Sequence, residues 1–117
     1  MDLHDLVRAI LSGDLLVARQ WVADAHRAGV QWERFEKPFG LDEREMTVAA
    51  GVAELLAARA GSPPPPWTLA VGPQQDVLLL DPGLELMPRT FARAKTSGAE
   101  PFRKRNLIAP PDFLDVR

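Results

Sequence analysis

The sequence predicts a mainly α-helical protein: a small helical bundle, made of an N-terminal helical hairpin and a long buried helix, with a proline-rich strap and an irregular C-terminal half. Two patterns predict this fold. Apolar residues recur every three or four positions through residues 1–61, and four consecutive prolines follow them. The length of 117 residues, with 46% hydrophobic content, suits one hydrophobic core. We therefore expect a single domain over 1–117, with 1–61 as its helical core and 62–117, the strap and a basic C-terminal segment, packed on that core.

Residues 2–12 and 14–29 are expected to form the helical hairpin. Gly13 ends the first helix, and Asp14 is placed to cap the second. Because the connection is so short, the apolar stripes of the two helices must face each other. These stripes are Leu3, Leu6, Val7, Ile10 and Leu11 in the first helix, and Leu15, Ala18, Trp21, Val22 and Ala25 in the second.

An irregular loop or single helical turn is expected over 30–40. Apolar periodicity fails there, and Trp32, Phe35 and Phe39 are spread through a charged stretch. We expect these aromatic side chains to close the open end of the hairpin.

A long helix is expected to begin at Asp42, because Asp42 and Glu45 have the spacing of a capping box. Its apolar stripe is so wide that only Thr47, Glu54 and Arg59 mark an exposed side, so this helix should be the most buried one. We favour an exposed Glu54. The alternative is a buried Glu54, whose carboxylate would need a partner.

The second half begins with the proline strap 63–66, which is expected to be a rigid internal connector anchored by Trp67. A ligand for a proline-binding module is the alternative. Residues 77–80 are expected to form a short buried strand or an extended core segment, with no obvious partner strand. A helix should follow from Pro88 to about Lys95, and a further turn from Pro101 to Arg105.

Charge is unevenly distributed along the chain. The whole chain carries a formal charge of −2, and residues 1–60 hold ten acids against seven bases. In 87–106, six basic residues face one acid, for a net charge of +5. This segment is expected to attract an anionic partner, either an acidic protein surface or a nucleic-acid backbone.

The composition also argues against several classes of protein. Without cysteine there is no disulfide scaffold, thiol nucleophile or thiolate metal site, and a reducing, cytoplasmic location is the expectation. The longest apolar run, 77–80, is far too short to span a membrane, and the first residues lack the positive charge of a signal peptide. We expect neither membrane insertion nor secretion.

No catalytic group, cofactor site or metal site is expected. His4 and His26 lie on different predicted helices, and neither has a second ligand at metal-binding spacing. The serines lie where helix caps and breakers belong, and no phosphate-binding loop is present. The acids of 42–45 are accounted for by a helix start. The sequence therefore predicts a protein that is not an enzyme.

The C-terminal half also contains several short elements in a characteristic order. These are Pro63-Pro64-Pro65-Pro66-Trp67-Thr68, Leu79-Leu80, Met87-Pro88-Arg89, Glu100-Pro101-Phe102-Arg103-Lys104-Arg105-Asn106 and Ala109-Pro110-Pro111-Asp112-Phe113-Leu114. From about Pro63 to Leu114 the chain resembles a family of small uncharacterised bacterial proteins, antitoxin-like, that are encoded beside nucleotidyltransferase-like proteins.

The resemblance implies a non-enzymatic accessory subunit or antitoxin that binds a nucleotidyltransferase-like protein and occludes its nucleotide-binding cleft. The residues expected to bind this protein partner are Arg89, Arg93, Phe102, Arg103, Lys104, Arg105, Phe113 and Leu114. One alternative is a DNA-binding, autorepressing regulator, although the second helix opens with Asp14-Leu15-Leu16 rather than with base-reading side chains. The other is a homo-oligomeric scaffold.

Overall fold

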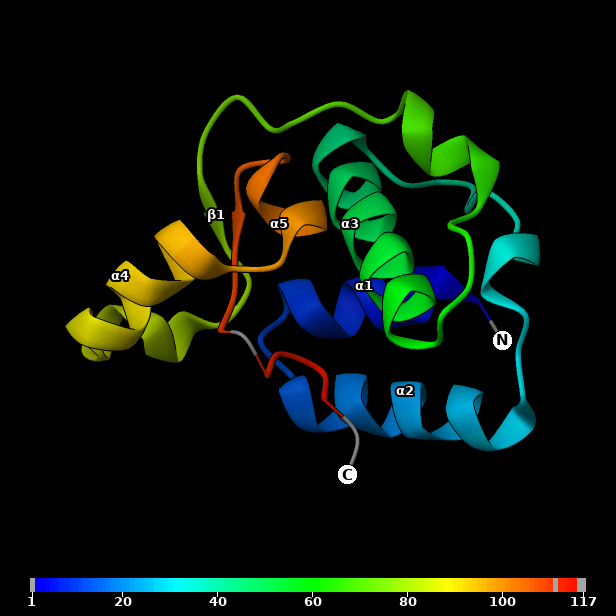
Figure 1. The fold of residues 1–117 in the computed structure, drawn as a ribbon, viewed down its shortest axis with the longest axis horizontal. Coiled ribbons are helices and arrows are strands. Elements are labelled where there is room, and N and C mark those ends of the chain that lie inside the picture. Colours follow the sequence, from blue (N-terminus) through cyan, green and yellow to red (C-terminus); the bar gives the residue numbers. More distant parts are fainter. Residues whose placement is uncertain (1, 111, 116–117) are drawn as a thin grey trace.

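Three helices form the N-terminal half of the protein, and the computed structural model describes residues 2–110 and 112–115. Helices α1 (Leu3–Leu11) and α2 (Leu15–Ala28) form the expected antiparallel hairpin, and α3 (Glu43–Arg59) packs across it (Figure 1). A single 3-10 turn, η1 (Trp32–Arg34), interrupts the loop between α2 and α3. The prediction of a mainly helical bundle is confirmed.

Local sequence signals set the ends of these helices. Asp14 caps α2 through its side chain, and Asp42 accepts a hydrogen bond from the Glu45 N–H at 2.8 Å. Glu45 closes the capping box by accepting from the Asp42 N–H at 3.1 Å. Gly29 and Gly61 follow α2 and α3 with φ of 66° and 71°, a left-handed conformation that glycine adopts without strain.

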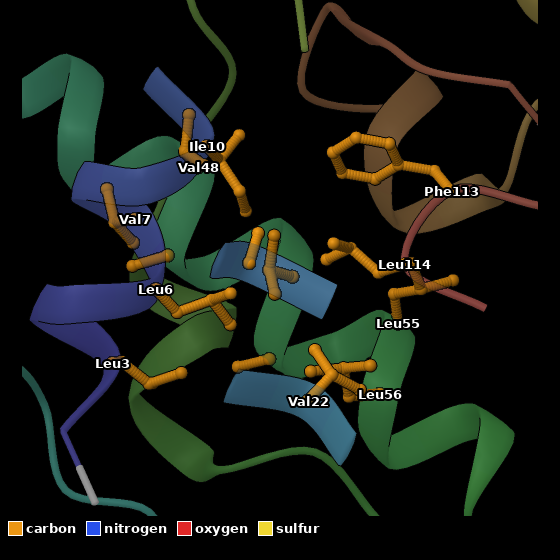
Figure 2. Packing of buried hydrophobic residues seen from close by; sticks show 14 of the residues in the cluster. Leu3, Leu6, Val7, Ile10, Val22, Val48, Leu55, Leu56, Phe113 and Leu114 are labelled. Atoms are coloured by element: carbon orange, nitrogen blue, oxygen red, sulfur yellow. The ribbon is translucent and has the colours of Figure 1, made fainter. Parts of the chain in front are cut away.

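Helix α3 lies at the centre of the core. Every residue from 47 to 57 is buried, because α1 covers one side of the helix while elements of the C-terminal half cover another. In Figure 2, Leu6 and Val7 of α1 and Val22 of α2 point toward the same core region as Leu56 of α3. The prediction that Thr47 and Glu54 lie on an exposed side of this helix is therefore wrong. Of the three residues predicted to be exposed there, only Arg59 is exposed.

Aromatic side chains fill the junction between α2 and η1. The rings of Trp32 and Phe35 stack with centroids 5.1 Å apart, and Trp21 packs 6.1 Å from Phe35. The indole N–H of Trp67 donates to the Phe35 carbonyl oxygen at 2.9 Å, which ties the end of the proline strap to this cluster. Phe39 does not join it: its side chain is 87% exposed, contrary to expectation.

The second half adds short elements around one edge of α3. They are η2 (Pro66–Ala70), β1 (Leu78–Leu79), η3 (Pro82–Leu86), α4 (Pro88–Ser97), α5 (Glu100–Arg103) and β2 (Leu107–Ile108). Strand β1 pairs in parallel with β2, with Leu78 opposite Leu107, so the partner strand missing from the sequence analysis lies near the C-terminus. The strap links α3 to η2 with Pro65 buried, as an internal connector does. Pro111, which belongs to the resemblance motif, lies outside the described residues.

We predict that Gly51→Val destabilises the protein by about 2–3 kcal/mol, because even a Cβ at this position would lie 2.9 Å from Leu107 Cδ1 and 3.1 Å from Phe102 Cδ1. Urea denaturation measures this change in the free energy of unfolding. Ala58→Val, at an exposed position of the same helix, is the control. Equal stability losses in the two variants would show that α5 and β2 do not pack tightly on α3.

Candidate protein-binding surface and the ion pair beneath it

The structure divides the eight predicted binding residues into a buried set and an exposed set. The exposed residues are Arg89, Arg93, Arg103 and Lys104, and the buried residues are Phe102, Arg105, Phe113 and Leu114. The prediction that the buried four lie on a partner surface is therefore wrong, since each is at most 2% exposed. They belong to the protein interior.

Phe113 and Leu114 lie in the main core rather than in a projecting tail. The Phe113 ring packs edge-on against the Phe102 ring, with centroids 5.9 Å apart. The side chains of Phe113 and Leu114 point inward from the C-terminal segment, residues 112–115 (Figure 2). Arg59 Nη1 donates a 2.7 Å hydrogen bond to the Phe113 carbonyl oxygen. An apolar pair that reads as an exposed anchor in the sequence thus seals one end of the core.

Arg105 is buried because Glu54, in the middle of α3, is its partner. Its Nη1 atom bonds the Glu54 carboxylate and also donates to the Pro101 carbonyl oxygen at 3.1 Å. Its Nη2 atom donates to the Thr68 carbonyl oxygen at 2.9 Å. Arg105 therefore connects α3, α5 and η2 at one point.

The second carboxylate oxygen of Glu54 accepts a 3.1 Å hydrogen bond from the Thr68 hydroxyl. Lys104 lies at the edge of the network, 44% exposed, with its ammonium 3.0 Å from Glu54 Oε1. Burial raises the pKa of Glu54, but the hydrogen bonds from Arg105, Lys104 and Thr68 and the charge of Arg105 outweigh it and hold this pKa below its ordinary value. Glu54 is thus a buried carboxylate that stays ionised.

The sequence predicted an exposed Glu54, and this was wrong because the partners of Glu54 are distant in the chain. Arg105 lies 51 residues away and Thr68 lies 14 residues away. The available signal was that Glu54 is the only acid in the apolar stretch 46–58 of this helix. A buried charge needs a partner, so this acid required a cation elsewhere in the chain. The run of three basic residues at 103–105 was a candidate source of that cation.

The exposed cations are carried by a unit with its own small core. Ala94 of α4 is buried against Leu84 of η3 and Ile108 of β2, and Phe91 packs at the margin of this cluster. The Lys95 ammonium lies 5.1 Å from the centre of the Phe91 ring. Helix α4 is therefore fixed to the two-stranded sheet, and in Figure 1 it projects to one side of the bundle.

This unit exposes cations on α4, two apolar side chains at the start of that helix, and the acid Glu85 just before them. Arg89, Arg93 and Lys95 are exposed on α4, which contains no acidic residue. At the start of the helix, Leu86 is 86% exposed and Met87 is 47% exposed. We call the three cations and the two apolar residues the α4 surface.

A cleft of about 140 Å³ joins the α4 surface to the segment that follows α5. Lys95 from α4 and Arg103 from α5 both line it, together with Asn106. Arg89 and Arg93 do not line this cleft, so Lys95 and Arg103 are the cations that it brings together from the two segments. Arg105 points into the core instead.

The described residues contain no group of three or more histidine or acidic side chains that could hold a metal ion, and no described helix has the length and apolar character needed to cross a membrane. Comparison with protein-family models, curated proteins and solved structures gives no match.

We predict that Glu54→Gln destabilises the protein by about 3 kcal/mol at neutral pH, because it removes the counterion of a buried guanidinium. The pKa of Glu54 is lowered in the folded state, so its contribution to stability is present above the pKa of an unfolded glutamate and is lost as the pH falls through the folded value. The difference between the two proteins should therefore shrink under acidic conditions.

Urea denaturation over a series of pH values measures this difference. Glu43→Gln, on the exposed first turn of the same helix, is the control and should show a much smaller effect. A difference for Glu54→Gln that does not change with pH would contradict an ionised Glu54.

Proposed function

We propose that the protein is a non-enzymatic binding partner that docks against an acidic surface of another protein through the α4 surface. The observation that carries this proposal is the combination of three exposed cations on a helix without acids and two exposed apolar side chains at its start. Interfaces commonly place arginine and apolar anchors together, with arginine binding carboxylates through its planar fork.

The unit that carries the α4 surface is suited to such docking. Helix α4 is held by Ala94 and Leu84 in a small core of its own, so its outer side chains are presented from a fixed backbone. Leu86 and Met87 would enter an apolar contact while Arg89 and Arg93 meet carboxylates around it. Long-range attraction by these charges would speed association and weaken with added salt.

The resemblance of residues 63–114 to antitoxin-like proteins supports a nucleotidyltransferase-like protein as the partner. A nucleotide-binding cleft lined by acids would accept a basic helix, and a standard interface of about 800 Å² per partner is large enough to cover it. Inhibition would then follow from occlusion and would require no chemistry by this chain.

DNA is the less favoured partner. The chain as a whole is negatively charged, and the first turn of α2, where a recognition helix would read bases, exposes Leu16 and Val17. The charge of the α4 surface is local, and apolar side chains border it. This pattern is more typical of a protein interface than of a phosphate-binding surface.

We predict that the double variant Arg89→Glu, Arg93→Glu weakens partner binding by about tenfold or more, because it replaces attraction with repulsion at the interface. The measurement is calorimetric titration with the protein encoded by the neighbouring open reading frame. Arg19→Glu, at an exposed position of α2, is the matched control and should leave affinity unchanged.

Equal affinities of the double variant and the control would rule out the α4 surface as the binding site. A shift of upstream DNA at physiological salt, without protein binding, would favour the DNA-binding regulator instead. A stable homo-oligomer that captures no neighbour-encoded protein would favour the scaffold.

A further inference from the structure

Strand β1 pairs with β2 along one edge, and its other edge is open. The N–H groups of Leu78 and Leu80 both donate toward β2, at 3.0 and 2.9 Å. Because N–H groups alternate in direction along a strand, those of Val77 and Leu79 point to the opposite side. Neither group has a hydrogen-bond partner among the described residues. The chain therefore presents an unpaired strand edge, at the side of the bundle from which α4 projects (Figure 1).

The apolar side chains of this edge are only partly covered. Leu78 packs at the margin of the main core, and Leu79 packs at the margin of the small core beneath α4, so the two lie on opposite faces of the sheet. Both are half-buried, and Val77 is 58% exposed. A third strand would cover all three side chains, and its backbone would bond the free N–H groups of the edge.

Acidic side chains border the edge on the side of α3. A groove of about 360 Å³ is lined there by residues 74–78 and by Glu43 and Arg44 from the first turn of α3. The carboxylates of Glu43 and Asp76 form no ion pair with other described residues. In addition, residues 74–87 contain three acids and no base. Basic side chains of an added strand would therefore be attracted to this side.

The side of the edge toward α4 favours uncharged side chains instead. Val77 lines the cleft that also contains Lys95 and Arg103, and these cations would repel a basic side chain placed there. Leu79 and Phe91 make the neighbouring surface apolar. Residues opposite each other on adjacent strands share a face of the sheet, so a strand added to this edge should alternate basic and apolar residues.

We propose that the open edge of β1 binds an extended peptide in which basic and apolar residues alternate. A second copy of this chain is a poor occupant, because pairing of two β1 edges would bring the acids that flank them close together. No residue of the α4 surface lines the acidic groove. Loss of this binding would therefore leave the proposed function standing, and the reverse also holds.

The probe is the acetylated and amidated peptide Lys-Val-Lys-Val-Lys-Val, titrated calorimetrically into the full chain. We expect it to bind with one-to-one stoichiometry. The same peptide with Glu in place of each Lys should bind about tenfold more weakly, because it brings like charges to Glu43 and Asp76. The peptide Lys-Lys-Lys-Val-Val-Val keeps the charge without the alternation, and it should also bind about tenfold more weakly.

Two N-methylated forms of the probe test strand addition directly. One form carries the methyl groups on its three lysine amides, and the other carries them on its three valine amides. Because successive amides of a strand point in opposite directions, only one set faces β1. One form should therefore lose binding while the other keeps it. With the unmethylated probe bound, amide hydrogen exchange of Val77 and Leu79 should become slower.

Variants of the chain assign the edge. Val77→Pro removes an N–H group that points away from β2, and it should weaken binding by about tenfold. Val77→Thr keeps this group and should bind like the unaltered chain. Asp76→Lys should weaken binding by about tenfold, whereas Glu36→Lys, at an exposed position outside the groove, should have no effect. Thermal unfolding checks that each variant is folded.

Absence of probe binding to the unaltered chain at millimolar concentration would overturn the proposal. Equal binding of the two N-methylated forms, or unchanged exchange of the Val77 and Leu79 amides, would contradict strand addition. Equal affinity for the peptide that contains Glu would contradict the preference for basic residues. Dimerisation of the chain that Val77→Pro abolishes would assign the edge to a second copy instead.

Discussion

The carboxylate of Glu54, enclosed in the middle of α3, is the constraint on which the rest of the structure depends. A buried charge is tolerated only with a partner, and Arg105 supplies it from the far end of the chain. Thr68 completes the network from η2. The helical core and the irregular C-terminal half are therefore joined at one polar point as well as by apolar packing.

We expect this ion pair to contribute specificity more than net stability. Arg105 Nε is buried without a hydrogen-bond partner among the described residues, and such an orphan donor costs about 1–3 kcal/mol. The network sets where the chain after α5 must lie: Asn106 turns with a φ of 60°, and its side chain donates to the Gln74 carbonyl oxygen at 2.6 Å. Strand β2 then pairs with β1, and Ile108 of β2 packs against Ala94 of α4. Glu54 therefore positions the proposed binding surface indirectly.

The sequence predicted what depends on neighbouring residues. Helix ends at Gly13, Asp14 and Asp42 follow from capping chemistry and backbone conformation, and the apolar stripes follow from helical periodicity. It did not predict features set by contacts between distant segments. Glu54 and Arg105 each read as exposed, because charge alone does not reveal a partner 51 residues away. The pairing of β1 with β2 and the burial of the C-terminal apolar pair were missed for the same reason.

A double-mutant cycle between Glu54 and Arg105 tests the central claim most directly. Glu54→Leu and Arg105→Met are measured singly and together by urea denaturation, and the cycle gives the coupling free energy between the two side chains. The account predicts strong favourable coupling, about 2 kcal/mol or more, with the double variant losing much less stability than the two single losses added together. Additive losses would show that the two side chains are stabilised independently and that no ion pair joins the two halves of the protein.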